Sequence, residues 1–477
     1  MKKIDVSILG LFSVVLLLFC NMCSPIYPTN WWCDANIFQV MGNEIWNGKV
    51  LYRDIYDQKG PVIFLIHALG RVAGAKTFLG TWLLLICACW GTLAGLMKTM
   101  MLWVKREVAL PLTLLVGAVA YCSINYGYGD TSEEWSLPVL AWVWYLFLRY
   151  AKKNELPNVW ESILMGIGMA LVFWNKYTIV LMFGGELLGA LIIAVLRHEF
   201  PRLIKPVLYT LLGFVGVSAA IMIAWACMGA LGDLIDGYFL FNLQHYTTTD
   251  EGRAYTELPK WILLIWALTS GLFWLLHDKR DVKIMTITTF AASTVLFYVV
   301  FCFFYYYLII YIFMALIAIS FERFDWVGGK LKGLWAVCLL LVVIRVATCY
   351  NVTELWTQKD GNWAAPMAER ILQDDAVEGQ GELMLYDHQN PAVFLQTNYP
   401  TKLRYFFRPN STYPAIMEEQ NANLEARAPK WVVTGTRLSD ELEYELVAEG
   451  IDYNRGGIKD MILHAEWTEP MYLYKRK

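Results

Sequence analysis

Residues 31–61 read WWCDANIFQVMGNEIWNGKVLYRDIYDQKGP and follow the first apolar run of a 477-residue chain. An apolar stripe with helical spacing runs through this stretch, at Ile37, Val40, Met41 and Ile45. The stripe predicts a helix that Gly48 can end. The next run, PVIFLIHALGRVAG at 61–74, is too short to cross a bilayer comfortably, so we expect a helix that lies in the membrane interface. The sequence therefore predicts a long, structured loop after a first membrane span.

Composition places most of the chain in a membrane. Apolar residues make up 57% and charged residues 17%, against about 45–50% and about 25% in soluble proteins. Residues 1–350 carry 26 Lys/Arg and 22 Asp/Glu, whereas the much shorter segment 351–477 carries 13 and 20. We therefore expect a transmembrane domain at 1–350 and a soluble domain at 351–477. These features exclude a soluble enzyme and a disordered chain, and the net charge of −3 without a basic tract predicts no nucleic-acid partner.

About eleven apolar runs can serve as membrane spans. They cover residues 5–24, 78–101, 108–124, 133–150, 160–174, 177–196, 206–228, 261–277, 283–302, 304–320 and 333–350. Lys and Arg gather in every segment that this scheme places inside, which predicts a cytoplasmic N-terminus. An odd number of spans then places the C-terminal domain outside, together with the loops at 25–77, 125–132 and 229–260. We expect a multi-pass, α-helical protein of the plasma (inner) membrane.

The segment 351–477 has the pattern of a small α/β domain. Short β-like runs occur at 382–387, 403–407, 430–434, 461–465 and 471–474. Helical patterns occur at 363–374, 390–397, 414–427 and 438–449.

The ten cysteines show no disulfide or zinc pattern, because no pair of CxxC motifs is present. Most of them lie in apolar runs, where we expect them to act as small hydrophobic residues: Cys87, Cys89, Cys122, Cys227, Cys302 and Cys338.

The first outer loop resembles that of the C-type glycosyltransferase superfamily, in particular the branch of protein O-mannosyltransferases and lipid A aminoarabinose transferases. In that family an acidic residue follows the first span, and an acidic-Lys-Pro type motif leads into an interfacial helix. Asp34 matches the first acidic position, and the run Asp57-Gln58-Lys59-Gly60-Pro61 is similar to the second motif. Ala35 follows Asp34 where the family often has an Asp-Glu pair.

The resemblance implies an inverting glycosyltransferase that uses a polyprenyl-phosphate-linked sugar and a glycan, lipid or protein acceptor. Such an enzyme needs a carboxylate base for the acceptor hydroxyl, cationic groups for the leaving phosphate and an apolar groove for the prenyl chain. The sequence contains no nucleotide-sugar Asp-x-Asp motif. A polytopic lipid or polysaccharide transporter or flippase is the alternative, although no internal repeat of the kind found in transporters is visible. A membrane scaffold protein is a third possibility.

Asp34 and Asp57 are the candidate catalytic carboxylates on this interpretation. The alternative for Asp34 is an N-cap role in a helix that starts at Ala35. Lys59 and Arg53 are candidates for binding the donor phosphate, and the alternative is a solvated loop with weak ion pairs.

Further candidates come from the other predicted outer segments. Lys176 is a phosphate-binding candidate that could instead extend to the interface. Asp130, Glu133 and Glu134 are candidates for binding sugar hydroxyls or a divalent cation, or they could simply stabilise a helix N-terminus. Asn242, His245 and Arg253 could line the acceptor side. Glu186 lies near the middle of a predicted span, where helix packing is the alternative to a functional role. Beyond a possible divalent cation, the sequence predicts no cofactor.

Overall fold

The computed structural model describes residues 1–245, 279–299, 304–357, 363–409, 411, 413–454 and 467–477. The chain divides into two compact units. The first, which we call the helical unit, contains residues 1–21, 85–221 and 250–353. The second, which we call the mixed unit, contains residues 22–84, 222–249 and 354–477.

The following helices lie wholly or in part in the helical unit, and all of them except α17 correspond to predicted spans. Their bounds are α1 Lys3–Cys20, α4 Leu79–Met100, α5 Arg106–Tyr121, α6 Ser132–Lys153, α7 Val159–Asn175, η2 Tyr177–Val180, α8 Leu181–Leu196, α9 Phe200–Cys227, α14 Arg280–Val299, η4 Phe304–Ile317, α15 Ala318–Phe321, α16 Gly328–Ala347 and α17 Tyr350–Thr357. Each predicted span except 261–277, which lies outside the described residues, coincides with a helix. Within the described residues, four helical segments are long and apolar enough to cross a membrane: α1, α4, α9 and the continuous pair η2–α8.

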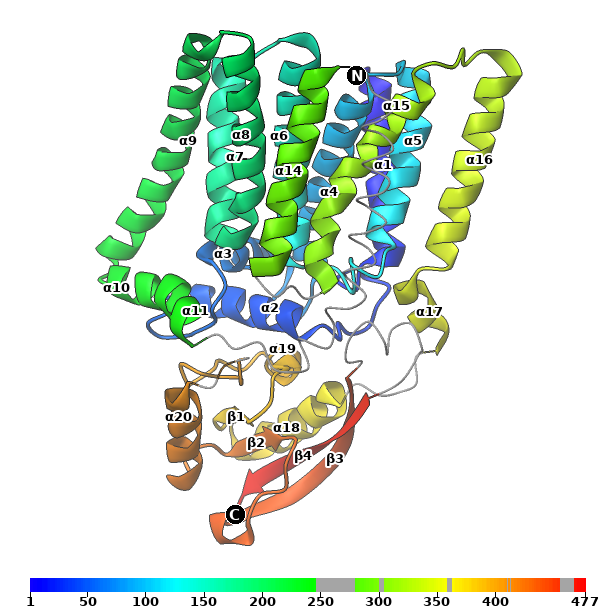
Figure 1. Ribbon diagram of the computed structural model, residues 1–477. Coiled ribbons are helices and arrows are strands. Elements are labelled where there is room, and N and C mark those ends of the chain that lie inside the picture. Colours follow the sequence, from blue (N-terminus) through cyan, green and yellow to red (C-terminus); the bar gives the residue numbers. More distant parts are fainter. Residues whose placement is uncertain (246–278, 300–303, 358–362, 410, 412, 455–466) are drawn as a thin grey trace. The chain divides into compact units, whose positions relative to one another are not determined.

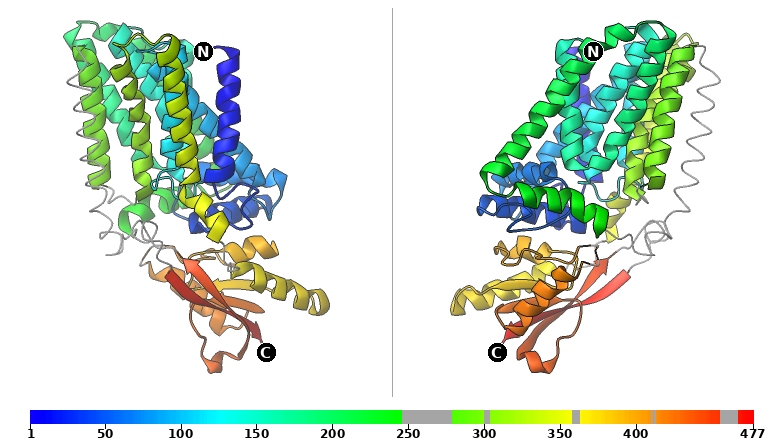
Figure 2. Two further views of the ribbon diagram at one scale, coloured as in Figure 1. Left: turned by 90° about the vertical axis from the view of Figure 1, so that its right-hand side faces the viewer. Right: turned by 60° about the vertical axis from the view of Figure 1, so that its left-hand side comes forward.

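Small residues allow the helices of this unit to approach closely. Helices α7, α8 and α9 lie side by side, and α14 runs along α8 (Figures 1 and 2). A Cβ atom at Gly185 of α8 would lie 2.7 Å from the carbonyl oxygen of Thr288 of α14. Close contact through glycine is the usual way in which helices pack in lipid, because no hydrophobic effect drives them together there.

The loop that the sequence predicts to lie outside, after the first span, belongs to the mixed unit and contains both predicted helices. Helix α2 covers Cys33–Trp46, and helix α3 covers Pro61–Gly70 and continues into the 3-10 turn η1 at Arg71–Ala73. Pro61 at the first helical position suits an N-terminus because its ring already has a helical φ. A second segment of this unit forms the short helices α10 Leu231–Ile235, η3 Asp236–Leu240 and α11 Phe241–Gln244.

The C-terminal segment is α/β, as the sequence predicts. Its strands are β1 Leu383–Tyr386, β2 Trp431–Thr434, β3 Tyr444–Asn454 and β4 Trp467–Arg476, in the sheet order β1-β2-β4-β3. Strands β1 and β2 are parallel, and the other neighbours are antiparallel. The accompanying helices are α18 Ala364–Glu378, α19 Ala392–Thr397, α20 Pro414–Glu425 and the 3-10 turn η5 Asp440–Leu442.

Alternating side chains of the sheet contact different helices. Met384 of β1 and Val432 of β2 pack with Leu424 of α20. The neighbouring Trp431 points to the opposite face, where its indole nitrogen donates to Asp375 of α18 at 3.0 Å. The sheet is therefore covered on both faces, as the period-two alternation of strands requires.

Two secondary-structure predictions in this segment are wrong. The helix predicted at 438–449 is instead the turn η5 followed by strand β3, because pairing with β4 overrides the local helix propensity of its Leu, Glu and Ala residues. The strand predicted at 403–407 is an irregular segment that buries Tyr405, Phe406 and Phe407 without joining the sheet. The strand predicted at 461–465 lies outside the described residues.

Candidate active site

Asp34 lies in the first turn of α2, and its carboxylate faces Lys59. The N-cap residue of α2 is Trp32, so the helix begins two residues earlier than predicted and the suggested N-cap role of Asp34 is wrong. An acidic group in this turn still interacts favourably with the helix dipole. Lys59 Nζ lies 3.4 Å from Asp34 Oδ2. The Asp34 side chain is 22% exposed, so it is open to solvent.

Lys59 lies immediately before the N-cap of α3, which is Gly60. The Tyr52 hydroxyl donates to the Lys59 carbonyl at 2.7 Å and fixes the backbone there. The Lys59 ammonium lies 5.6 Å from the centre of the Phe38 ring, within the range of a cation–π contact. Its charge is therefore held between a carboxylate and an aromatic ring, beside a helix N-terminus of the kind that binds anions.

Asp57 is the second acidic residue of the motif, and its side chain is buried. Its Oδ1 accepts the backbone N–H of Gln58 at 2.7 Å, whereas its Oδ2 has no hydrogen-bond partner. Burial raises the pKa of Asp57 to about 6; the Lys59 charge opposes this shift, and the Asp34 charge adds to it. Two carboxylates and one ammonium thus form a coupled group, which we call the first-loop cluster (Asp34, Asp57 and Lys59).

A set of hydrogen bonds holds the loop that carries this cluster. The Asn242 amide donates to the carbonyl oxygens of Gln58 and Tyr238, both at 2.8 Å. The Tyr56 N–H donates to the Arg404 carbonyl at 3.0 Å. Asn242, a predicted acceptor-side residue, therefore lies beside the motif and fixes its backbone.

The remaining candidates of the mixed unit make other contacts. The Arg53 guanidinium makes two hydrogen bonds with the Asp54 carboxylate, at 2.8 and 2.9 Å, and a third with the Met228 carbonyl at 3.1 Å. The His245 ring lies 4.6 Å from the Tyr413 ring, measured between centroids. Arg253 lies outside the described residues.

In the helical unit, Glu133 and Lys176 form a buried ion pair. Lys176 Nζ lies 2.6 Å from Glu133 Oε1, and only 1% of the Glu133 side chain is exposed. The same ammonium lies 3.6 Å from the centre of the Tyr306 ring. The predicted phosphate-binding lysine and one predicted sugar-binding acid are thus direct partners.

Asp130 and Glu134 build the turn that leads into α6. Glu134 accepts the Tyr126 hydroxyl at 2.8 Å and the Asp130 N–H at 2.6 Å. The Thr131 hydroxyl caps the helix by accepting the Glu134 N–H, and Asp130 accepts the indole N–H of Trp135 at 2.9 Å. In the described residues, Asp130, Glu133 and Glu134 do not gather their oxygens as a metal site would. These contacts suit the structural alternative considered from the sequence.

The structure also shows participants that the sequence did not single out for this site. Phe38 contacts Lys59, Tyr52 fixes the Lys59 carbonyl, and Tyr306 covers Lys176. Phe38 follows Asp34 by four residues in a predicted helix, so its position beside the acid could have been inferred from helical spacing. The partners of Lys176 are distant in sequence and gave no such signal.

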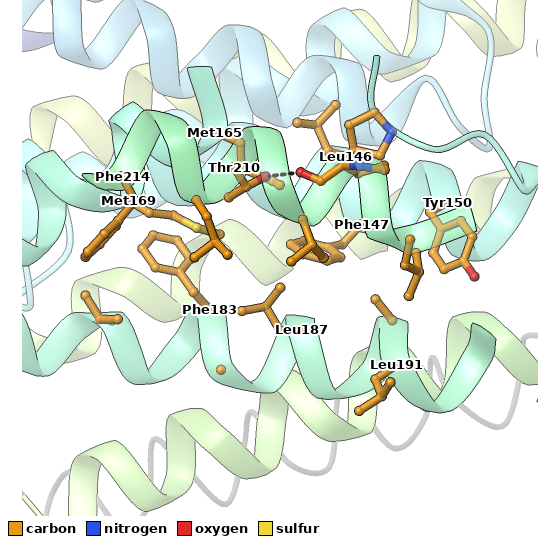
Figure 3. A pocket seen from close by; sticks show the side chains of 18 of the residues that line it. Leu146, Phe147, Tyr150, Met165, Met169, Phe183, Leu187, Leu191, Thr210 and Phe214 are labelled. Atoms are coloured by element: carbon orange, nitrogen blue, oxygen red, sulfur yellow. Dashed lines mark hydrogen bonds between the residues drawn. The ribbon is translucent and has the colours of Figure 1, made fainter. Parts of the chain in front are cut away.

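The helical unit contains a large apolar cavity (Figure 3). Its volume is about 1030 Å³, and its walls come from α6, α7, η2, α8, α9 and a residue of α14. Phe147, Met169, Leu187 and Phe214 point toward it. The Thr210 hydroxyl in its wall donates to the Pro206 carbonyl at 2.8 Å, so this polar group is already satisfied. A cavity with such walls suits a hydrocarbon ligand.

The many-helix architecture, the helical first loop and the C-terminal α/β segment together have the fold of the C-type glycosyltransferases, which confirms the resemblance at the level of the fold. Among solved structures, the chain is similar to ArnT from Cupriavidus metallidurans bound to undecaprenyl phosphate, with a TM-score of 0.62 and 14% identity over 98% of this chain and 97% of that chain. It is also similar to the oligosaccharyltransferase AglB from Archaeoglobus fulgidus, which was solved with an inhibitory peptide and a dolichol-phosphate; the TM-score is 0.50 and the identity 11%, over 90% of this chain and 69% of that chain. No protein-family model and no curated relative matches the sequence.

Proposed function

We propose that the chain is an integral-membrane, inverting glycosyltransferase that moves a sugar from a polyprenyl-phosphate donor to an acceptor hydroxyl on the outer face of the membrane. The observation that carries this proposal is the first-loop cluster, which joins an accessible carboxylate to an ammonium group at a helix N-terminus. The polyprenyl phosphates bound by ArnT and AglB support the same class of donor.

Asp34 is the proposed base. It takes the proton of the acceptor hydroxyl while that oxygen attacks the anomeric carbon from the face opposite the phosphate. The new oxygen–carbon bond forms as the bond between the anomeric carbon and the phosphate oxygen breaks, and polyprenyl phosphate leaves. Lys59 stabilises the negative charge that develops on the departing phosphate. Asp57 is too deeply buried to meet the acceptor directly, so we assign it to orienting Lys59 through its charge.

The other candidate residues have supporting roles in this proposal. Lys176 stays a predicted phosphate-binding residue and Asp130, Glu133 and Glu134 stay predicted sugar-binding residues, although the buried ion pair between Lys176 and Glu133 would have to open before either could contact a ligand. Asn242 positions the first-loop motif, and His245 and Arg253 stay predicted acceptor residues. Arg53, which makes two hydrogen bonds with Asp54, has no role in the proposed transfer step.

The apolar cavity is the proposed site of the donor's prenyl chain. Its volume of about 1030 Å³ and its aliphatic and aromatic walls suit a long, flexible hydrocarbon. Recognition there would depend on chain length more than on the sugar.

For the whole chain we propose eleven spans, with a cytoplasmic N-terminus, and two functional domains. Residues 1–350 carry the membrane part of the catalytic machinery, and residues 351–477 form an α/β domain outside the membrane. The basic residues in each predicted inside segment support this orientation.

The proposal is tested with the purified protein and a radiolabelled polyprenyl-phosphate sugar. Asp34→Asn keeps the shape of the side chain and removes its basic oxygen, so transfer should fall by about 10²-fold or more. The melting temperature should stay close to that of the wild type, because Asp34 is partly exposed and does not cap α2.

Asp54→Asn is the matched control, since Asp54 lies on the same loop but pairs with Arg53. Its transfer rate should remain near the wild-type rate. Normal transfer by Asp34→Asn would contradict the base assignment, and absence of transfer by the wild-type protein with every polyprenyl-phosphate donor would contradict the proposed function.

A further inference from the structure

Three cysteines from distant parts of the chain meet inside the helical unit. Cys20 ends α1, Cys122 follows α5, and Cys349 lies between α16 and α17. Their sulfur atoms all lie within 4.8 Å of one another, and those of Cys20 and Cys122 are 3.1 Å apart. None of the three residues is more than 2% exposed. The sequence assigned Cys122 to hydrophobic packing, so this cluster was not foreseen.

Two polar side chains bind the backbone beside the three cysteines. The Arg345 guanidinium donates to the Cys122 carbonyl and brings a positive charge to the cluster. The Asn351 amide donates to the carbonyl oxygens of Cys20, at 2.5 Å, and Gly127, at 3.0 Å. Asn351 is completely buried, yet its Oδ1 atom has no hydrogen-bond partner. A buried carbonyl oxygen without a partner is costly, so its presence here needs an explanation.

Cys349 lies beside the N-terminus of α17. The residue immediately precedes α17, and the backbone N–H groups of Asn351 and Val352 in the first turn of that helix face its sulfur. Backbone N–H groups at a helix N-terminus stabilise a thiolate, which is the form of cysteine that binds metal ions.

We propose that Cys20, Cys122 and Cys349 bind a divalent, thiophilic metal ion of the zinc type. With a zinc–sulfur distance of about 2.3 Å, the sulfurs of a trigonal or tetrahedral site lie about 3.8–4.0 Å apart. The cluster has this size, and small side-chain rotations bring Cys20 and Cys122 to that separation. The Asn351 oxygen is available as the fourth ligand or as the partner of a bound water molecule.

The net charge of the three thiolates and Arg345 favours a divalent ion. Binding releases the three thiol protons and leaves three negative charges. A divalent ion and the Arg345 guanidinium together supply three positive charges, so the buried site becomes neutral, as a low-dielectric environment favours. A disulfide between two of the cysteines is the competing arrangement, but it gives no role to the third thiol or to the Asn351 oxygen.

The site is tested on the full-length protein purified from cells supplied with zinc. We expect about one zinc ion per chain by elemental mass spectrometry, and a chelator should lower the melting temperature by several degrees. Cobalt substitution should produce the thiolate-to-cobalt charge-transfer absorption in the near ultraviolet. The single variants Cys20→Ser, Cys122→Ser and Cys349→Ser should lose the ion. Cys338→Ser, which changes a buried cysteine of α16 outside the cluster, should retain it.

Several outcomes would overturn this assignment. Metal-free wild-type protein with two fewer titratable thiols than its ten cysteines would show a disulfide instead. Copper(I) in place of a divalent ion would contradict the charge argument. Retention of zinc in all three cluster variants would place the ion elsewhere. If the variants do not fold, the metal content and the cobalt spectrum of the wild-type protein decide the question.

Discussion

Lys59 forms contacts with both a carboxylate and an aromatic ring, and the proposed function requires it to bind phosphate as well. Lys59→Ala removes a charge-assisted interaction worth about 1.5–3 kcal/mol. We therefore expect the KM for the donor to rise about 10- to 100-fold, while the KM for the acceptor changes little. Steady-state kinetics with each substrate varied in turn will measure both values.

Lys76→Ala is the control for this experiment, because Lys76 is an exposed lysine of the same loop. It should leave both KM values near those of the wild type. An unchanged donor KM in Lys59→Ala would remove Lys59 from the phosphate site.

The raised pKa of Asp57 predicts a pH dependence of stability. The usual carboxyl value is 3.8 and that of the folded protein is about 6, so between these values the folded state binds more protons than the unfolded state. The contribution of Asp57 to the free energy of unfolding has its full value below about pH 4 and is lost as the pH rises toward 6. The loss amounts to about 3 kcal/mol.

Asp57→Asn should remove this slope, because an amide does not titrate. Melting temperatures of both proteins between pH 4 and 7 will show it, and Asp54→Asn should keep the wild-type slope. Parallel curves for the wild type and Asp57→Asn would contradict the assignment.

At the level of residues, the sequence identified the members of the first-loop cluster but not their surroundings. Asp34, Asp57 and Lys59 could be found because they lie within one short stretch that resembles a known motif. The second pair, Glu133 and Lys176, consists of two predicted residues whose direct contact was not foreseen. Their pairing depends on how α6 and α7 pack against each other, and this packing cannot be predicted from the two residues and their neighbours in sequence.

At the level of elements, helix α8 offers a direct test of the prenyl site. Leu187→Trp fills part of the apolar cavity, which Leu187 lines. We expect transfer from a long-chain donor to fall several-fold, whereas a donor with a short prenyl chain is used nearly as well as before. The measurement is kcat/KM as a function of prenyl length.

Leu188→Trp is the matched control, since Leu188 belongs to the same helix and is similarly exposed but does not line the cavity. Its chain-length dependence should equal that of the wild type. An equal loss with short and long donors in Leu187→Trp would argue against a prenyl chain in this cavity.

Elements that depend on local pattern were predicted well. Where the structure describes the chain, apolar runs gave the membrane helices with ends at most six residues from the observed ones, and proline with the charged motif marked the start of α3. The segment 438–449 failed because its helix-forming residues are used in a strand, where β4 supplies the backbone partners. Helix α2 starts at Cys33, two residues before the predicted start. Its N-cap residue Trp32 makes no side-chain cap bond, so the sequence carries no capping signal at the true start.

At the level of the whole molecule, the proposed topology has a simple test. A reporter enzyme that is active only outside the cytoplasm should be active when fused after Lys477 and inactive when fused before Met1. The reason is that basic residues, which favour the cytoplasmic side, occur in every predicted inside segment. The reverse pattern of activity would contradict the orientation.

Contacts between segments that are far apart in the sequence could not be predicted from the sequence alone. The mixed unit joins the first loop to the C-terminal segment, for example through hydrogen bonds from the Asn36 side chain to Asn390 and from the Thr401 N–H to Glu44. The three clustered cysteines likewise come from three separate parts of the chain. Neither arrangement has a local signature, because each arises only when the elements have packed.

The contact between α2 and α3 has a mechanical consequence. A Cβ atom at Gly42 of α2 would lie 2.6 Å from the backbone nitrogen of Ala68 in α3, so the two helices touch with no side chain between them. Trp46 adds a hydrogen bond to the Ala68 carbonyl at 2.6 Å. Asp34 and Lys59 belong to the starts of these two helices, so thermal motion tends to move them together. The packed helix pair therefore preorganises the opposite charges of Asp34 and Lys59 at a fixed spacing before a substrate binds. Preorganisation of this kind reduces the conformational entropy that is lost on binding.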